Sequence, residues 1–189
     1  MTLRLGIDLD GVVADFSAGW VECYNRDFGT SLDASDMQVW DAPAEMTHFA
    51  DMDGFWEWAR ECGGGHSLFR VLRPYPGALE ALDELNRLGH HLVIVTTKPD
   101  YAVSDTYAWL AEHGVPATEV HIVWDKTRVV CDVYVEDGPH NLEALALKRS
   151  EALIIRYVRP WNDPVPGVVD ARDWDEVLEL IAERSRGRT

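Results

Sequence analysis

Apolar and polar positions along the chain follow two different periods. Five short apolar runs have the length and composition of buried strands, at residues 3–9, 91–96, 120–124, 132–136 and 152–158. Between and after them, four segments repeat their apolar positions every three to four residues, at 78–88, 101–113, 141–148 and 174–184. Because strands and helices alternate across short connections, the pattern predicts an α/β fold with a doubly wound parallel sheet and helices on both faces.

One long segment interrupts this alternation. Residues 12–28 have helical spacing and end at Gly29, residues 52–60 predict a second helix, and the remainder up to residue 73 is irregular. The run Pro74-Tyr75-Pro76-Gly77 marks the return to the regular pattern. We therefore predict a small, mostly helical cap at residues 14–75, inserted after the first strand into a core formed by residues 1–13 and 76–189.

Composition and charge limit the classes of partner. The 189 residues include 33 acidic and 17 basic side chains, so the formal net charge is −16, which disfavours nucleic acid polymers and anionic membranes. No apolar run approaches the roughly 18 residues of a membrane helix. Three cysteines without a CxxC motif predict reduced thiols, and a strand beginning at residue 3 leaves no room for a removable presequence. We expect a cytoplasmic protein, and its oligomeric state stays open, with a homodimer as one option.

Polar residues gather where the predicted strands end. The segments are Asp8-Leu9-Asp10-Gly11, Thr96-Thr97-Lys98, Lys126 and Glu136-Asp137-Gly138. In doubly wound sheets ligands bind at this edge. Carboxylates gathered there repel one another unless a cation lies among them, and Mg²⁺ is the hard cation that oxygen ligands favour. Any one acid could merely cap a helix or solvate a loop, but all four segments together favour a magnesium and phosphate site.

The segment DLDGVVADF at residues 8–16 resembles the first motif of phosphatases in the haloacid dehalogenase (HAD) superfamily, which have a Rossmann-like core. The superfamily's other motifs follow in order, as VIVTT at 93–97, Lys126 and Glu136-Asp137. Three further segments resemble the 5′(3′)-deoxyribonucleotidase family more specifically, LRPYPGALEAL at 72–82, TYAWLAEHG at 106–114 and DKTRVVCDVYVEDGPHN at 125–141. The likeness covers nearly the whole chain and is weak within residues 30–60.

This resemblance implies catalysis through an aspartyl-phosphate. Asp8 would be the nucleophile, and Asp10 would protonate the leaving alcohol and then activate water. Lys126 would neutralise the developing charge. Asp8, the backbone carbonyl of Asp10, and Asp137 would hold Mg²⁺. Thr96 would bind a phosphoryl oxygen, and Thr97 and Lys98 are further candidates for binding the substrate.

Two positions depart from the family's pattern. The family commonly has two aspartates where this chain has Glu136-Asp137, so a glutamate would have to reach Lys126 if the first acid orients that lysine. The family commonly has Thr-Ser where this chain has Thr96-Thr97, here followed by Lys98. Lys98 has two interpretations, either a second phosphate-binding cation or a strand cap that points to solvent.

The predicted cap is rich in aromatic residues, with 11 of the chain's 19 at residues 16–75. They could form a stacking wall for a nucleobase or the cap's own hydrophobic core. For most of them the core interpretation is favoured. Phe16 is the exception, since it follows the first motif closely and matches a family position that lines the base pocket. Trp56 is a second candidate.

These features predict a Mg²⁺-dependent phosphomonoesterase whose substrate is a small phosphomonoester, a (deoxy)ribonucleoside monophosphate. One alternative keeps the chemistry and changes the substrate to a sugar phosphate or another small phosphometabolite. Another alternative is a regulatory module that binds Mg²⁺ and phosphate without turnover, which is disfavoured because Asp8 and Asp10 are both present. A dehalogenase is disfavoured because Asp10 supplies an acid that phosphate ester cleavage needs.

Overall fold

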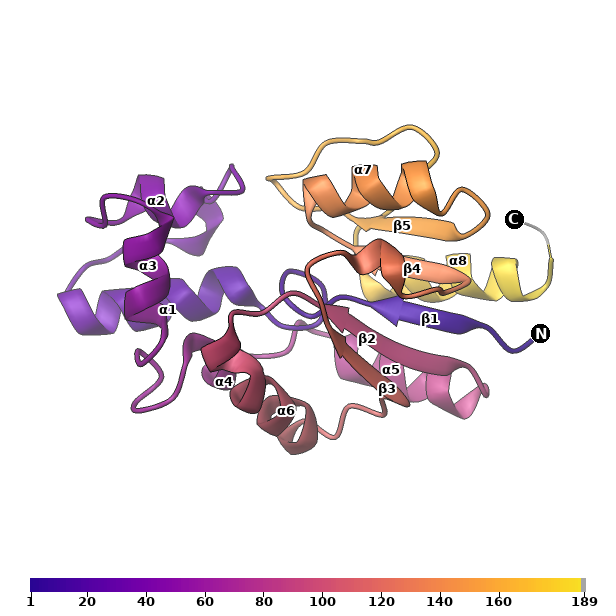
Figure 1. The fold of residues 1–189 in the computed structure, drawn as a ribbon, viewed down its shortest axis with the longest axis horizontal. Coiled ribbons are helices and arrows are strands. Elements are labelled where there is room, and N and C mark those ends of the chain that lie inside the picture. The colour runs from indigo at the N-terminus through magenta and orange to yellow at the C-terminus, as the bar shows by residue number, and fades with distance from the viewer. Residues whose placement is uncertain (188–189) are drawn as a thin grey trace.

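A six-stranded parallel sheet forms the centre of the larger part of the molecule, in a computed structural model that describes residues 1–187 (Figure 1). Its order is β3-β2-β1-β4-β5-β6, and every neighbouring pair is parallel. The strands are β1 (Arg4–Ile7), β2 (His91–Thr96), β3 (Glu119–Ile122), β4 (Val133–Glu136), β5 (Leu153–Tyr157) and β6 (Val169–Ala171). The doubly wound parallel sheet is confirmed. The pattern predicted five of these strands and missed β6, a three-residue edge strand without an apolar run.

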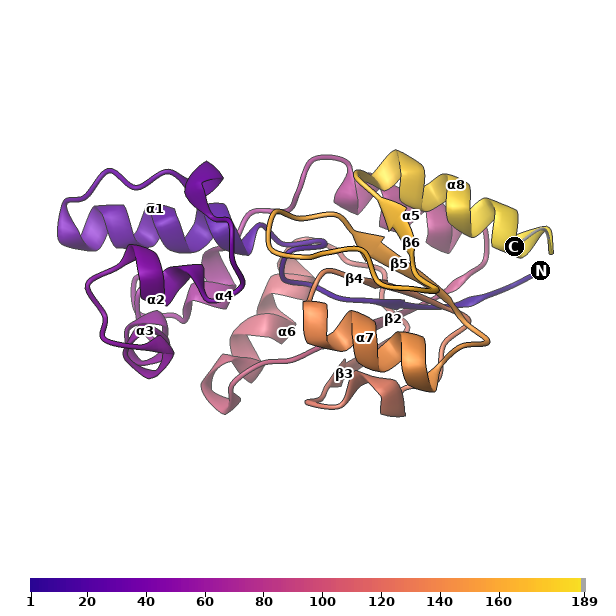
Figure 2. The same cartoon turned by 90° about the horizontal axis from the view of Figure 1, so that it is seen from above.

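Helices cover both faces of the sheet (Figure 2). On one face lie α5 (Ala78–Arg87) and α8 (Trp174–Ser185), and on the other lies α7 (Pro139–Lys148). Alternate strand residues serve the two sides: Ile94 and Val135 belong to the cluster that includes α5 and α8, whereas Val95 and Tyr134 pack with α7. Within residues 1–187, no helix combines the length and apolar character needed to cross a bilayer.

Four helices between β1 and α5 lie beside the sheet, at the left of Figure 1. They are α1 (Phe16–Phe28), α2 (Ala42–Met46), α3 (Met52–Ala59) and α4 (Leu68–Val71). The chain enters and leaves this group through two paired stretches, since Asp15 N–H donates to Arg73 O (2.8 Å) and Tyr75 N–H donates to Val13 O (2.8 Å). On this basis we propose residues 14–75 as the cap. The remaining helix, α6 (Val103–Glu112), packs against α4, and short 3₁₀ helices occupy Ala34–Asp36, Asp100–Ala102 and Lys126–Arg128.

Helix α1 begins later than its apolar spacing predicts, at Phe16 instead of residue 12. The Leu9 carbonyl accepts hydrogen bonds from the backbone N–H groups of Val12, Val13 and Ala14 at 2.8–3.2 Å, which winds residues 9–14 into a tight loop. Asp15 then caps the helix by accepting from Ala18 N–H (3.0 Å). The predicted stop is confirmed, since Gly29 takes the left-handed conformation.

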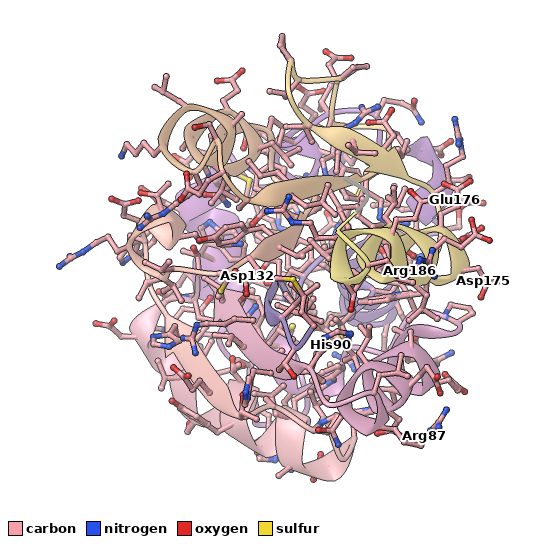
Figure 3. The ribbon with its side chains drawn as sticks, turned by 90° about the vertical axis from the view of Figure 1, so that its right-hand side faces the viewer. Arg87, His90, Asp132, Asp175, Glu176 and Arg186 are labelled. Carbon is pink, nitrogen blue, oxygen red and sulfur yellow. The ribbon has the colours of Figure 1, made fainter. Side chains whose placement is uncertain are left out.

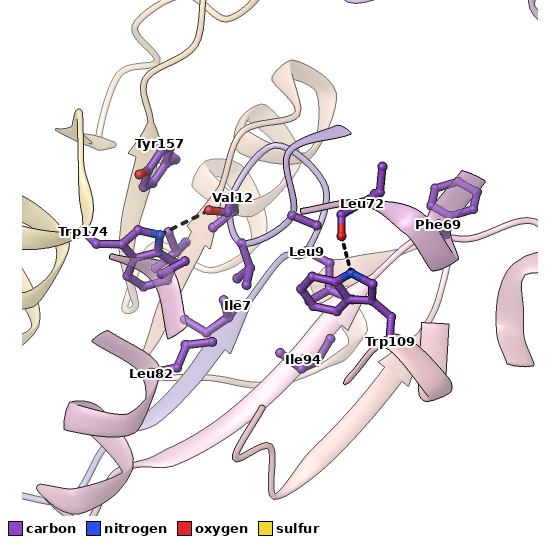
Figure 4. Close-up of a cluster of buried hydrophobic side chains, with 14 of the residues drawn as sticks. Ile7, Leu9, Val12, Phe69, Leu72, Leu82, Ile94, Trp109, Tyr157 and Trp174 are labelled. Carbon is purple, nitrogen blue, oxygen red and sulfur yellow. Dashed lines mark hydrogen bonds between the residues drawn. The ribbon is translucent and has the colours of Figure 1, made fainter. Parts of the chain in front are cut away.

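Two buried tryptophans join the sheet to the segments that carry its site (Figure 4). Trp174 of α8 donates from Nε1 to the Val12 carbonyl (3.3 Å), and Trp109 of α6 donates to the Leu72 carbonyl (2.8 Å). Both rings lie in the main hydrophobic core. Because each indole finds an acceptor on a loop, the core fixes the loop after β1 and the return from the cap.

Polar side chains secure the amino ends of the strands, which face the viewer in Figure 3. Leu3 N–H donates to Nδ1 of His90 (3.1 Å), just before β2 begins. Arg4 N–H donates to Oδ2 of Asp132 (2.8 Å), just before β4 begins. These bonds hold β1 in register with both neighbours at the end of the sheet opposite the clustered acids.

Candidate active site

Asp8 follows β1 directly, on the inner part of the sheet. Its N–H donates to Val135 O (3.0 Å), which continues the pairing with β4. Its Oδ1 accepts from the N–H of Leu9 (2.8 Å), and its Oδ2 lies 2.6 Å from Nζ of Lys126. Contacts on both oxygens therefore hold this buried carboxylate in one orientation.

Lys126 connects Asp8 to Glu136. Its Nζ lies 2.6 Å from Asp8 Oδ2 and 2.6 Å from Glu136 Oε2. Burial by itself disfavours the ammonium, but Asp8 and Glu136 outweigh it and raise the pKa of Lys126. Glu136 thus reaches this lysine although it is longer than aspartate. Its Oε1 also accepts from the N–H of Gly138 (2.9 Å), which fixes the glutamate from its other side.

Three carboxylates come close enough to share a cation. Asp8, Glu136 and Asp137 offer oxygen atoms that all lie within 4.8 Å of one another. Burial raises the pKa of Glu136 to about 7, and the charge of Asp8 adds to that shift. Burial and the charges of Glu136 and Asp8 raise the pKa of Asp137 well above its usual range. Burial is the largest cause of both shifts, and the neighbouring carboxylates add to it. An oxygen donor set of this kind fits Mg²⁺.

Three residues that the sequence pattern missed contact Asp137 or the neighbouring Gly11. Trp161 donates from Nε1 to Asp137 Oδ2 (3.0 Å), and Asn162 donates from Nδ2 to the Asp137 carbonyl (2.8 Å). Arg159 donates from Nε to the Gly11 carbonyl (2.7 Å). All three residues follow β5 at the same edge of the sheet, and this position after a strand was the signal that could have found them.

Gly11 packs directly against Asp137. Its φ is +75°, and a Cβ built on it would lie 2.5 Å from Asp137 Cγ and nearer still to Oδ2. Both the backbone conformation and the close approach therefore require glycine at this position.

Asp10 lines the cavity described below, and its carboxylate forms an ion pair with Lys98. Burial raises the pKa of Asp10, and Lys98 opposes that shift. The Lys98 side chain is only 1% exposed, so the interpretation as a solvent-facing cap is wrong. Lys98 is also not among the residues that line the cavity, because its ammonium is held by Asp10 and lies over the ring of Phe69 (4.5 Å to the centroid).

The two threonines after β2 differ in what their hydroxyls do. Thr96 is buried and lines the cavity, and its Oγ1 has no hydrogen-bond partner within residues 1–187. The hydroxyl of Thr97 donates to the Val123 carbonyl (2.8 Å), so this group is already engaged, although Thr97 also lines the cavity. An orphaned buried hydroxyl beside the acids is what a phosphoryl oxygen would satisfy.

A cavity of about 380 Å³ extends from this edge towards the cap. Asp8, Lys126 and Asp137 line it on the sheet side, and Phe16 and Trp56 line it on the cap side. Both aromatic residues contact Phe69, with ring centroids 6.1 Å and 6.2 Å apart. The structure thus brings both predicted base-binding residues to the same space as the acids.

Other cap aromatics pack among themselves. Trp20 and Phe55 are fully buried with ring centroids 5.9 Å apart, and Phe49 and Trp58 contact Phe55. This arrangement agrees with the interpretation of these residues as the cap's own core. The pattern did not single out Trp40, which lines the cavity and contacts His140 of α7 (5.4 Å between centroids).

Comparisons with known proteins identify a matching family and similar sequences. A family model described as 5′ nucleotidase, deoxy (pyrimidine), cytosolic type C protein matches residues 2–187. A Chlorobaculum tepidum protein assigned as a 5′(3′)-deoxyribonucleotidase is 30% identical over 189 residues, 95% of this chain and 90% of that protein. The human cytosolic-type 5′(3′)-deoxyribonucleotidase is 29% identical over 142 residues, 72% of this chain and 71% of that protein.

A solved structure shows the same fold. A HAD hydrolase of Bacillus subtilis, bound to magnesium, matches with a TM-score of 0.62 and 15% identity over 96% of this chain and 99% of that one. At this identity the likeness concerns the fold alone. It confirms the HAD-like α/β architecture that the motifs predict.

Proposed function

This chain belongs to the family of 5′ nucleotidase, deoxy (pyrimidine), cytosolic type C proteins and is therefore a phosphoric monoester hydrolase, and we propose that it hydrolyses (deoxy)ribonucleoside monophosphates through a phosphorylated Asp8. The observation that carries the proposal is one continuous cavity with Asp8, Lys126 and an orphaned threonine hydroxyl at one end and aromatic rings at the other. In this proposal the phosphate binds at the first end and the base at the second. We also propose the cytosol as its compartment.

In the first step Asp8 attacks phosphorus and the leaving alcohol departs. Lys126 holds the Asp8 carboxylate at 2.6 Å and balances charge on the phosphoryl oxygens. The Thr96 hydroxyl donates to one of those oxygens. Asp10 gives its proton to the leaving oxygen, and the phosphoryl group is then carried by Asp8.

In the second step water hydrolyses the aspartyl-phosphate. Asp10, now deprotonated, takes a proton from this water and directs it to phosphorus. Asp8 is restored, and inorganic phosphate leaves. The same residue thus serves first as acid and then as base.

The donor set described above supports Mg²⁺ as the cofactor. Asp8, Asp137 and the backbone carbonyl of Asp10 would hold the ion, while Glu136 remains with Lys126. When bound, Mg²⁺ supplies positive charge that lets the nucleophile and the phosphate dianion approach each other. Trp161 and Gly11 keep Asp137 in position for this role.

A panel of phosphomonoesters tests the proposal directly. Deoxyribonucleotides, ribonucleotides, sugar phosphates and p-nitrophenyl phosphate are compared with Mg²⁺ and with EDTA. We expect Mg²⁺-dependent phosphate release with the highest kcat/KM for a nucleotide. No release from any member would refute the proposal, and a preference for sugar phosphates would replace its substrate.

Asp8→Asn tests the nucleophile. This variant should abolish turnover while its circular dichroism spectrum stays native, because the amide keeps the shape but cannot form the phosphorylated intermediate. Asp83→Asn, which alters an exposed aspartate of α5, is the matched control and should retain full activity. Turnover by Asp8→Asn at a rate near that of the wild type would contradict the mechanism.

A further inference from the structure

Lys98 is a buried cation for which the catalytic steps above have no use. The chain has three lysines, and their side chains differ sharply in exposure: 1% for Lys98, 4% for Lys126 and 56% for Lys148. Lys126 contacts Asp8 and Glu136, and Lys148 lies at the surface near Asp125. Lys98 instead pairs with Asp10.

The surroundings of Lys98 give its ammonium one charged partner. The ammonium donates to Oδ2 of Asp10. On its other side lies the ring of Phe69, 4.5 Å from Nζ to the centroid. Leu72 and Trp109 line the same small space beside Lys98. An ammonium buried among apolar groups is costly without a partner, so Lys98 and Asp10 are held together.

This pairing engages one carboxylate oxygen of Asp10, Oδ2, and leaves the other oxygen, Oδ1, available. Within residues 1–187, no hydrogen bond engages Oδ1 of Asp10. Asp10 lines the cavity and Lys98 does not. Lys98 therefore contacts the Asp10 carboxylate from the side away from the cavity.

We propose that Lys98 is a positioning residue for the leaving-group step: it anchors Oδ2 of Asp10 and thereby directs the other carboxyl oxygen to the ester oxygen of the substrate. The inference rests on the proposed role of Asp10 as general acid. Lys98 acts through Asp10 and does not bind phosphate. Phe69 covers the ammonium and also contacts Phe16 and Trp56, so these aromatic rings shield Lys98 from water, whereas the Asp10 side chain is 26% exposed.

The leaving group distinguishes this role from phosphate binding. A nucleoside alkoxide is a poor leaving group and needs a proton from Asp10, whereas p-nitrophenolate departs without one. The parameter kcat/KM reports only the steps up to the first irreversible one, the transfer to Asp8. A positioning role therefore predicts a loss of kcat/KM for the nucleotide and little loss for p-nitrophenyl phosphate.

Lys98→Met removes the charge and keeps an unbranched apolar side chain. We expect its kcat/KM for a deoxyribonucleoside 5′-monophosphate to fall about 100-fold, the lower end of general acid catalysis, and its value for p-nitrophenyl phosphate to change less than about 3-fold. Lys98→Arg keeps a cation and should recover part of the nucleotide rate. In an Asp10→Asn background, Lys98→Met should cause no further loss, because its effect passes through Asp10.

The other two lysines provide matched controls. Lys148→Met should leave both substrates unchanged, and Lys126→Met should lower kcat/KM for both together, since Lys126 contacts the nucleophile. Thermal unfolding and circular dichroism check that each variant is folded. If Lys98→Met is not folded, Lys98→Leu takes its place, and a substrate ratio in Lys98→Leu equal to that of the wild type overturns the inference.

Two results with folded Lys98→Met would overturn the inference, an equal loss for both substrates or no loss for either. Both leave the proposed function intact, provided that the wild type turns over both substrates. Absence of wild-type turnover would instead refute the proposed function, and this inference with it.

Discussion

Replacing Gly11 by alanine tests whether the loop after β1 and Asp137 must fit closely together. A Cβ at this position would lie 2.5 Å from Asp137 Cγ, whereas ordinary contact begins at 3.4 Å. Either Asp137 or the loop must therefore move by about 1 Å, and a misplacement of that size at a reaction centre costs about 100-fold in rate. We expect Gly11→Ala to lose about that factor in kcat and to require more Mg²⁺ for half-maximal activity.

The same substitution also strains the backbone, and a second glycine isolates that effect. Gly11 has a φ of +75°, where a side chain costs about 1–2 kcal/mol. Gly89, between α5 and β2, has a φ of +83° and nothing within 4 Å of a built Cβ. Gly89→Ala should therefore lose a similar amount of stability without losing activity.

Urea unfolding in EDTA measures the stability of both variants, and kcat/KM is measured across a series of Mg²⁺ concentrations. We expect backbone strain to destabilise both variants and the contact with Asp137 to destabilise Gly11→Ala further, with loss of turnover and of Mg²⁺ response in Gly11→Ala alone. Wild-type turnover by Gly11→Ala would refute the argument from close packing. An equal loss of activity in Gly89→Ala would show that backbone strain alone explains the effect.

Three further predictions follow from the site. Thr96→Val removes a buried hydroxyl without a hydrogen-bond partner, so it should raise the free energy of unfolding in EDTA by up to about 1 kcal/mol. The same variant should weaken inhibition by inorganic phosphate. A loss of stability would contradict the first expectation. The folded pKa of Glu136, about 7, lies above its ordinary 4.5, so its contribution to stability in EDTA is present at low pH and declines between about pH 4.5 and 7. Thermal unfolding from pH 4 to 8 should show that decline in the wild type and a flatter profile in Glu136→Gln; a steeper profile in the variant would refute it. Phe16→Ala should raise KM for a deoxynucleotide about 10-fold and leave KM for p-nitrophenyl phosphate unchanged. Phe28→Ala is the control and should alter neither KM. Equal effects of Phe16→Ala on both substrates would exclude base stacking.

The sequence predicted best those elements whose surroundings are uniform. The strand His91–Thr96 was placed to the residue because both of its faces are buried, which produces an unbroken apolar run. The edge strand Val169–Ala171 was missed because its Asp170 faces Arg156 in an ion pair, and a charged residue within three positions leaves no strand pattern. The start of α1 was also misplaced, since the loop at residues 9–14 is wound by hydrogen bonds to one carbonyl and not by apolar spacing.

The same distinction applies to the candidate site. Asp8, Lys126 and Asp137 could be found because parallel strands bring their ends to one edge, so chain order alone places them together. Trp161 also follows a strand, but that position did not show its role, because its hydrogen bond to Asp137 spans 24 residues and depends on how a loop folds back. For a related reason the sequence left two interpretations of Lys98 open, since whether a lysine after a strand points to solvent or inward depends on the partner that the fold offers it.

The charges around the cavity determine what this acidic chain needs in order to bind an anionic substrate. Of only three lysines in a protein with a net charge of −16, two are buried in this region, each against a carboxylate. Asp8, Asp10, Glu136 and Asp137, if all ionised, outnumber Lys98 and Lys126 by two charges. The lysines therefore hold the carboxylates in position but leave no excess of positive charge for a phosphate dianion. We propose that a divalent cation supplies that excess, so we expect phosphate binding and Mg²⁺ binding to strengthen each other.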